Sequence, residues 1–199
     1  MLTLMSARLD TTPRAQSDAR QRILETAYDL FSRRGIRGVG VDEVIQRAGV
    51  AKATLYRHFP SKDDLVLAFL DLREQRWTRD LVEKEARRRG ANAEEQILAI
   101  FDVFDDWFRR DDFEGCAFIS VLLEMGAHHA AGRASVAHLV NVRSVVRTLA
   151  EEAELRDPPG FARLLLIVMQ GSIIAAAEGD MEAAQRARSI ARLLIDQHR

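Results

Sequence analysis

The residues best suited to chemistry lie in one short segment, residues 52–62. Its first part predicts a helix from Lys52 to Phe59, on which Leu55 and Phe59 are four residues apart and face the core. The polar side chains that remain for solvent or a ligand are Lys52, Thr54, Tyr56, Arg57 and His58. Cationic, hydroxyl and aromatic groups in this mixture can hydrogen-bond phosphates and base edges in a major groove. The segment therefore predicts contact with double-stranded DNA.

The element before this helix favours the same interpretation. A second short helix is predicted from Val41 to Ala48, and a tight turn from Ala48 to Ala51 joins the two. Gly49 can take the left-handed conformation that such a turn needs. Two short helices joined in this way form a helix-turn-helix, whose second helix enters the major groove.

The rest of the chain has helical periodicity and no sustained strand-like alternation. A helix is predicted from about Ser17 to Arg34, where Gly35 closes it. A long helix starts at the cap Ser61, with Asp64 as an acidic capping-box partner, and runs to about Arg89. Further helices are expected to begin near Asn92, Ala117, Gly132, Phe161 and Met181. The sequence thus predicts an all-α fold of about nine helices.

These elements group into three segments. Residues 1–16 are expected to be a flexible tail, residues 17–62 a three-helix helix-turn-helix domain, and residues 63–199 a second helical domain. The net charge of −1 conceals an asymmetry, because residues 1–60 carry ten Lys/Arg against six Asp/Glu while the remainder carry 19 against 24. A basic first third on an acidic body is expected when one end of a protein faces phosphates.

The first third of the chain also resembles a known family. Residues 48–65, AGVAKATLYRHFPSKDDL, are similar to the signature of TetR-family repressors, and the resemblance extends over residues 20–69. Its combination of Leu-Tyr-x-His-Phe with a following Ser-Lys is highly specific. The remaining residues match the family only in length, number of helices and placement of the last two helices.

The resemblance implies roles for individual residues in DNA binding. Tyr56 and Lys62 match positions that usually grip phosphate, and Lys52 opens the recognition helix, where its charge can reach the backbone. Thr54, Arg57 and His58 match the part of that helix that contacts bases or backbone. The resemblance also implies a homodimer, which would present two recognition helices to a roughly palindromic operator.

Two positions depart from the family pattern. Gly40 stands where the second helix usually has a Ser or Thr cap, and Ala51 stands where the third usually has Ser. Glycine costs only a few tenths of a kcal/mol as an N-cap, whereas alanine costs about 1 kcal/mol. We therefore expect the motif to fold with one or two phosphate contacts missing.

The second domain contains candidates for a small-molecule site. The family places its ligand cavity among these helices, and apolar and aromatic residues here could line one, with two polar anchors. The candidates are Phe104, Trp107, Phe108, Phe118, Leu122, Met125, Met169 and Ile173, with Gln170 and His128 as anchors. The alternative for each residue is ordinary core packing, because aromatic stripes at helical spacing usually pack. As a group they suggest a hydrophobic or aromatic effector.

Catalysis, metal binding and cofactor binding are not expected. Gly35, Gly38 and Gly40 do not have the spacing of a phosphate loop, and no catalytic constellation is recognisable. His128 and His129 are adjacent, so they face different directions on a helix and lack further metal ligands. Cys116 follows several acidic residues that disfavour a thiolate, and is expected to be small and packed.

The last two helices are predicted to form the dimer interface. Small and apolar faces allow close packing with symmetry mates. The residues assigned to these faces are Leu164, Leu165, Val168, Ser172, Ala176, Ala183, Ala187, Ile190, Ala191, Leu194 and Ile195. The apolar stretch from Phe161 to Ala177 contains Arg163 and Gln170 and is read as a buried helix rather than a membrane span.

A single cysteine and no recognisable signal peptide predict a cytoplasmic protein. The leading functional hypothesis is a homodimeric repressor that a small effector releases from DNA. The alternative is a helical ligand-binding or protein-interaction module without sequence-specific DNA binding, which would show no salt-dependent affinity for DNA.

Overall fold

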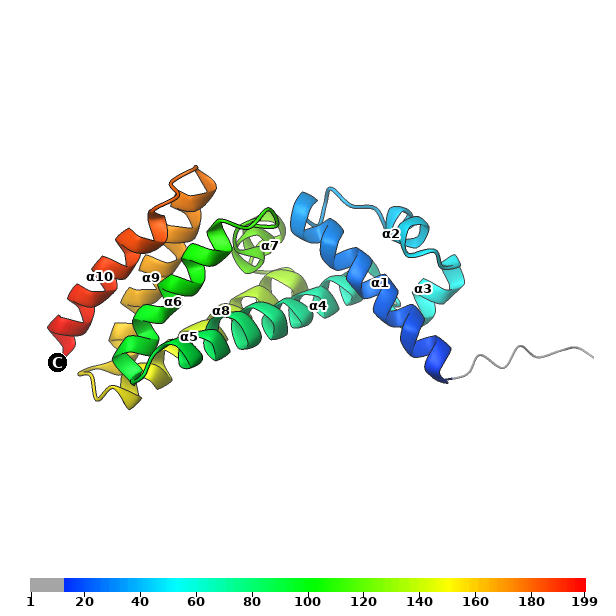
Figure 1. The fold of residues 1–199 in the computed structure, drawn as a ribbon. Helices are drawn as coiled ribbons and strands as arrows, with labels where there is room; N and C mark the ends of the chain where they lie inside the picture. Colours follow the sequence, from blue (N-terminus) through cyan, green and yellow to red (C-terminus); the bar gives the residue numbers. More distant parts are fainter. Residues whose placement is uncertain (1–12) are drawn as a thin grey trace, which may run out of the picture. The chain divides into compact units, whose positions relative to one another are not determined.

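The computed structural model describes the backbone of residues 13–199 and the side chains from Asp18 onward. The predicted tail at residues 1–16 lies outside the described residues except for its last four, which are helical. Residues 13–199 form helices and connecting turns without a strand (Figure 1), which confirms the all-α prediction.

The first three helices are α1 (Pro13–Arg34), α2 (Val41–Ala48) and α3 (Lys52–His58). α1 begins at Pro13, four residues before the predicted start, and proline is favoured at a first helical position because its missing N–H is not needed there. Gly35 ends α1 with a φ of 72°, as the sequence predicts, and its N–H donates to the Phe31 carbonyl.

The turn between α2 and α3 has the expected left-handed glycine. Gly49 has φ 63° and ψ 42°, and its N–H donates to the Gln46 carbonyl at 3.3 Å. Val50 N–H donates to the Ile45 carbonyl, so the last carbonyls of α2 are satisfied. Neither Gly40 nor Ala51 provides a side-chain cap, in agreement with the two departures noted in the sequence.

One long helix follows, in three consecutive segments: α4 (Lys62–Arg73), a π-helical segment η1 (Glu74–Glu83) and α5 (Lys84–Arg89). The predicted capping box is present, because Ser61 N–H donates to Asp64 Oδ2 at 2.9 Å and Asp64 N–H to Ser61 Oγ at 3.1 Å. The π-helical register was not predicted. It makes i→i+5 hydrogen bonds and therefore brings residues five apart, such as the buried Trp77 and Val82, toward the same side.

The remaining helices are α6 (Ala93–Phe108), α7 (Ala117–Met125), α8 (Ala130–Glu152), α9 (Pro158–Ala177) and α10 (Ala183–His198). With α4, η1 and α5 counted as one helix, residues 13–199 contain the nine helices that the sequence predicts. Asn92 caps α6 by accepting the Glu95 N–H, and Asp157 caps α9 by accepting the Gly160 N–H. α9 starts three residues before the predicted Phe161, because Pro158 and Pro159 fit its first turn.

α9 is the central apolar helix of this group. It packs against both α8 and α10, and α6 packs against α10, so the three helices α6, α9 and α10 lie side by side (Figure 1). α9 is long and apolar enough to cross a membrane by length and composition alone. However, 44% of its most apolar window is buried within the protein, which agrees with the prediction of a packed core helix.

The chain divides into two compact units, the first ending at Leu65 and the second spanning Val66–Arg199. The domain boundary predicted at residues 62/63 lies three residues earlier. We refer to these as unit 1 and unit 2.

Candidate functional site

The short helix α3 has one buried and one exposed side. Leu55 and Phe59 are buried, as predicted, and the Arg20 guanidinium of α1 lies 5.1 Å from the centroid of the Phe59 ring. Lys52, Tyr56 and Arg57 are exposed. The core residues therefore fix the rotation of α3 and turn these three polar side chains to solvent.

Two of the exposed side chains have no partner among the residues that the structure describes. Among the described residues, neither the Tyr56 hydroxyl nor the Arg57 guanidinium has a hydrogen-bond or ion-pair partner, and Tyr56 is 39% exposed. Lys52 Nζ lies 3.5 Å from Asp42 Oδ1, but both side chains are well exposed, so this pair contributes little to stability and can exchange for a phosphate. Thr54 is half-buried.

His58 differs from the other predicted DNA contacts. Its Nε2 is buried and has no hydrogen-bond partner. Burial, with the nearby charges of Arg57 and Arg20, lowers the pKa of His58 below its ordinary value. The geometry favours a neutral, partly packed ring at the end of α3 over a side chain directed at DNA.

Lys62 connects two segments of unit 1. Its Nζ donates to the Ile36 carbonyl at 2.5 Å, so the side chain ties the start of α4 to the loop after α1 and is half-buried. An ammonium group has three protons, so a phosphate contact is compatible with this bond. The structural bond was not predicted from the sequence.

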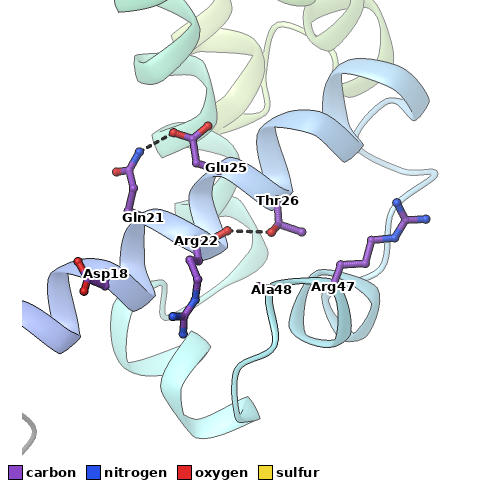
Figure 2. Close-up of a pocket in the computed structure, with 7 residues that line it drawn as sticks. All are labelled: Asp18, Gln21, Arg22, Glu25, Thr26, Arg47 and Ala48. Atoms are coloured by element: carbon purple, nitrogen blue, oxygen red, sulfur yellow. Dashed lines mark hydrogen bonds between the residues drawn. The ribbon is translucent and has the colours of Figure 1, made fainter.

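A polar groove of about 540 Å³ lies on unit 1 beside the turn (Figure 2). Thr26 Oγ1 donates to the Arg22 carbonyl and Gln21 Nε2 to Glu25 Oε1, so much of its lining is already hydrogen-bonded. Its residues are Asp18, Gln21, Arg22, Glu25 and Thr26 of α1, with Arg47 and Ala48 of α2. Equal numbers of acidic and basic side chains line it, and none of the residues predicted to bind a ligand does.

Four of the predicted ligand-binding residues form an aromatic group in unit 2. Phe104, Trp107, Phe108 and Phe118 are all buried. The ring of Trp77, which the sequence analysis did not single out, lies 5.9 Å from Phe104, 5.5 Å from Trp107 and 6.3 Å from Phe118 between centroids. The π-helical segment thus places a further aromatic ring among the predicted residues.

The other predicted ligand residues are distributed differently. Met169 and Ile173 are buried on α9, with Gln170 half-buried beside them. Leu122 and Met125 are half-buried on α7. His128 is exposed, and its carbonyl accepts a hydrogen bond from Arg133, so the structure does not support its prediction as an internal polar anchor.

Polar residues in the same region were missed by the sequence analysis. On η1 and α8, Thr78 and Ser135 are fully buried, and His138 Nδ1 lies 3.2 Å from Glu74 Oε2. The His138 ring also stacks on Phe118 at 5.0 Å. Ring contacts join five of these residues, which we call the Trp77 cluster: Trp77, Phe104, Trp107, Phe118 and His138. The adjacent Trp-Thr pair in an otherwise charged stretch was the available sequence signal.

The prediction about Cys116 needs a different physical reason. The cysteine is buried, and burial rather than acidic neighbours raises the pKa of its thiol, which disfavours the thiolate. Among the described residues, no group of three or more His, Cys, Asp or Glu side chains could hold a metal ion.

Comparisons with known proteins agree with the helix-turn-helix geometry. Residues 23–69 match the family described as bacterial regulatory proteins of the tetR family. The transcriptional activator FasR of Mycolicibacterium smegmatis is 35% identical over 98 residues, which are 48% of this chain and 43% of FasR, so the matched region spans less than half of that relative. The repressor KstR of Rhodococcus jostii is 28% identical over 83% of this chain and 76% of its own length.

Solved structures extend the likeness to both units. SCO4454, a TetR-family transcriptional regulator from Streptomyces coelicolor, has 33% sequence identity and a TM-score of 0.82, covering 92% of this chain and 97% of its own. Reduced NemR of E. coli has the same fold at 22% identity and a TM-score of 0.78. The relatives are transcriptional regulators rather than enzymes. The chain belongs to the TetR family of DNA-binding transcriptional regulators.

Proposed function

We propose that this regulator is a repressor that binds a palindromic operator as a homodimer and leaves it when a small, apolar effector binds unit 2. The observation that carries the proposal is the surface of α3, where Tyr56 and Arg57 are exposed above a buried Leu55 and Phe59 and have no partner in the described part of the chain. Free donors on a rigidly held short helix suit phosphate and base contacts.

The contacts differ in kind. Arg57 can make a bidentate contact to guanine or to phosphate, and Tyr56 can donate one hydrogen bond to a phosphate oxygen. Lys52 and Lys62 add charge at the ends of the motif, and Thr54 adds a hydroxyl. His58 has a supporting role, because its buried Nε2 cannot reach DNA without movement of the ring.

The dimer face that we propose differs from the sequence prediction in its residues. Leu165, Ser172, Ala176, Ala187 and Ala191 are buried inside unit 2, where α9 and α10 pack on their neighbours. Two predicted residues, Leu164 of α9 and Ile190 of α10, are exposed. Ile167 and Ile174 of α9 and Leu193 of α10, which were not predicted, are exposed as well, and the five side chains are 43–66% accessible.

These five residues and Gly171 make up what we call the α9–α10 face. Positions 164, 167, 171 and 174 follow the three- and four-residue spacing of one helix side. A contiguous apolar patch of this kind marks an interaction site, and family members typically dimerise. We propose that a second copy of this chain covers the α9–α10 face.

Coupling between effector and DNA is proposed to run through the long helix. α4 begins in unit 1 and continues without a break into η1, which carries Trp77. A ligand that displaces the side chains of η1 is expected to shift α4 and change the separation of the two recognition helices. The ligand must favour the DNA-incompetent state by its difference in affinity between the two states.

We favour repression over activation because the matching repressor aligns with this chain over more of its length than the matching activator does. The repressor KstR matches over 76% of its length, whereas the activator FasR matches over 43% of its own. We propose that the protein acts in the cytoplasm, where a bacterial regulator meets chromosomal DNA.

The role of α3 is tested by DNA affinity as a function of salt. For the full chain on a mixed-sequence duplex, we expect the logarithm of the binding constant to fall linearly with the logarithm of salt concentration, with a slope of about −0.9 per phosphate contact. Arg57→Ala should make the slope shallower by about 0.9 for each phosphate that Arg57 contacts. Fluorescence anisotropy of a labelled duplex measures both slopes.

Arg147→Ala is the matched control, because Arg147 is an exposed arginine of α8 that pairs with its helical neighbour Glu151. This variant should retain the slope of the unmodified protein. Equal slopes for Arg57→Ala and the unmodified protein, together with equal affinity for the operator, would contradict the proposed role of α3.

A further inference from the structure

The first helix places an arginine beside the end of α3. Arg20 lies in the first half of α1, and its guanidinium is 5.1 Å from the centroid of the Phe59 ring. Phe59 directly follows the last residue of α3 and is buried, and α1 packs against α3 within unit 1 (Figure 1). Arg20 is therefore held at the C-terminal end of α3, although the two are far apart in the sequence.

Arg20 has no counter-charge within the described part of the chain. Its side chain is exposed, and no hydrogen bond or ion pair joins it to another described residue. By contrast, Arg34 and Arg47 of the same unit both contact Glu43 Oε1, at 2.7 and 3.1 Å. The five N–H donors of the Arg20 guanidinium thus remain available to an external acceptor.

The charges next to Arg20 are also positive. Burial lowers the pKa of His58, and the charges of Arg57 and Arg20 lower it further. Both guanidinium groups are therefore close enough to act on the same imidazole. Like charges repel each other, so two uncompensated arginines at one end of a short helix favour the binding of an anion there.

Stacking gives Arg20 a more defined position than a fully solvated arginine has. A guanidinium over an aromatic ring gains a cation–π attraction, and its planar set of donors matches the oxygens of a phosphate. A side chain that is already held in place loses less conformational entropy when it binds. The contact with Phe59 therefore prepares Arg20 for an anion instead of consuming its hydrogen-bonding groups.

The anion that fits this position is a phosphate of DNA. A helix that enters the major groove lies between two phosphate backbones, and contacts to them fix the orientation of the protein on the duplex. We propose that Arg20 binds a backbone phosphate of the operator beside the end of α3, so that α1 and α3 contact the same duplex. The inference rests on the function proposed above for α3. The DNA contacts expected from the sequence were confined to α3 and the start of α4, and did not include α1.

The test is fluorescence anisotropy of the full chain on a labelled mixed-sequence duplex over a series of KCl concentrations. Arg20→Gln removes the charge and keeps a polar side chain. We expect its salt slope to be shallower by about 0.9 for each copy of Arg20 that contacts a phosphate. Affinity at the lowest salt concentration should fall by about tenfold or more, because a charge-assisted hydrogen bond is lost. A slope equal to that of the unmodified protein would overturn the proposal.

Arg22→Gln is the matched control on the same helix. Arg22 is also exposed and has no partner among the described residues, but it lines the polar groove with the carboxylates of Asp18 and Glu25 (Figure 2). Two residues correspond to about 200° of rotation around a helix, so Arg22 and Arg20 leave α1 on different sides. The slope should change less than half as much as in Arg20→Gln. An equal change would show that the overall charge of α1 matters and not a contact by Arg20, which would overturn the proposal.

Arg20→Lys separates the lost charge from disturbed packing of Phe59. Lysine keeps a cation that can reach a phosphate, so this variant should retain at least half of the slope that Arg20→Gln loses. Circular dichroism at the temperature of the binding assay should show the same helix content in all variants. A slope as shallow in Arg20→Lys as in Arg20→Gln would assign the effect to the packing of unit 1 and would overturn the proposal.

The dependence on DNA sequence distinguishes a phosphate contact from a base contact. Phosphate contacts carry no direct sequence information, so Arg20→Gln should weaken binding to an operator enriched from a random library and to the mixed-sequence duplex by the same factor. A loss confined to the operator would indicate a base contact and overturn the proposal. If Arg57→Ala behaves as expected and Arg20→Gln leaves the slope unchanged, only this inference is wrong. If the affinity of the unmodified protein does not depend on salt, the function proposed for α3 is wrong as well.

Discussion

Gly171→Arg is expected to convert the dimer into a folded monomer and to lower operator affinity by about 100- to 10,000-fold. Gly171 lies at the centre of the α9–α10 face, and a Cβ added there meets no atom within 4 Å. The subunit can therefore accept the larger side chain, and replacing a helical glycine stabilises the helix by about 1 kcal/mol. A buried, unpaired guanidinium at a symmetric interface is strongly destabilising. A monomer has one recognition helix instead of two, so it loses the avidity that a dimer gains by binding two half-sites at once.

Sedimentation equilibrium measures the oligomeric state, and anisotropy on an operator duplex measures the affinity. Gln185→Arg is the matched control, because it adds the same charge on an exposed part of α10 outside the spacing of Ile190 and Leu193. This control should remain dimeric. A dimeric Gly171→Arg protein with full operator affinity would show that the α9–α10 face is not the interface.

The second large effect is expected from Phe59→Ala, which should unfold unit 1 while leaving the helices of unit 2 folded. Phe59 is buried under the Arg20 guanidinium, and truncating a core phenylalanine costs about 3–5 kcal/mol. A unit of this size has a stability of only about 3–10 kcal/mol at the usual value per residue. Hydrogen exchange should therefore lose protection in α1–α3 and retain it in α6–α10, and DNA binding should be abolished.

Tyr56→Phe provides the contrast on the same helix. Because the Tyr56 hydroxyl is exposed and unpartnered, its removal should change the free energy of unfolding by no more than about 0.5 kcal/mol. A lost hydrogen bond to a charged phosphate should still weaken DNA binding by about tenfold or more. Two results would contradict the division of α3 into a structural and a recognition side. One is retained hydrogen-exchange protection in α1–α3 of Phe59→Ala, and the other is full DNA affinity of Tyr56→Phe.

The helix-turn-helix could be predicted closely because each local signal was unambiguous. Gly49 was the residue suited to a left-handed turn, and Ser61 with Asp64 formed a recognisable capping box. Leu55 and Phe59 were apolar residues at helical spacing in a polar stretch, so the buried side of α3 was defined. Sequence alone could not show that Lys62 bonds the Ile36 carbonyl, since the two are 26 residues apart.

The face of α9 could not be assigned for the opposite reason. This helix is apolar on all sides, so periodicity does not distinguish the side that packs within the subunit from the side left exposed. The small residues Ser172 and Ala176 are predicted from the sequence to lie in the dimer interface, but they are buried within unit 2. The α9–α10 face is formed by larger residues such as Ile167 and Ile174.

Trp77 and Thr78 were missed because the charged residues around them in the sequence give no sign that the two side chains are buried. Trp77 and Thr78 lie between charged residues in a stretch that reads as a solvated helix, but the packing of η1 against α6 and α8 buries them. The aromatic stripe of α6 was visible, so Phe104 and Trp107 were predicted, whereas the groups that face them depend on tertiary packing.

The most direct test of the central claim is selection of bound fragments from a random DNA library by the full chain, repeated with Arg57→Ala and Tyr56→Phe. The α3 geometry predicts that the unmodified protein enriches a palindromic sequence. Arg57→Ala should relax the preference at the contacted base pairs, whereas Tyr56→Phe should bind more weakly but prefer the same sequence. An enriched sequence without two-fold symmetry, or the same preference and yield for all three proteins, would contradict a dimeric regulator that reads DNA through α3.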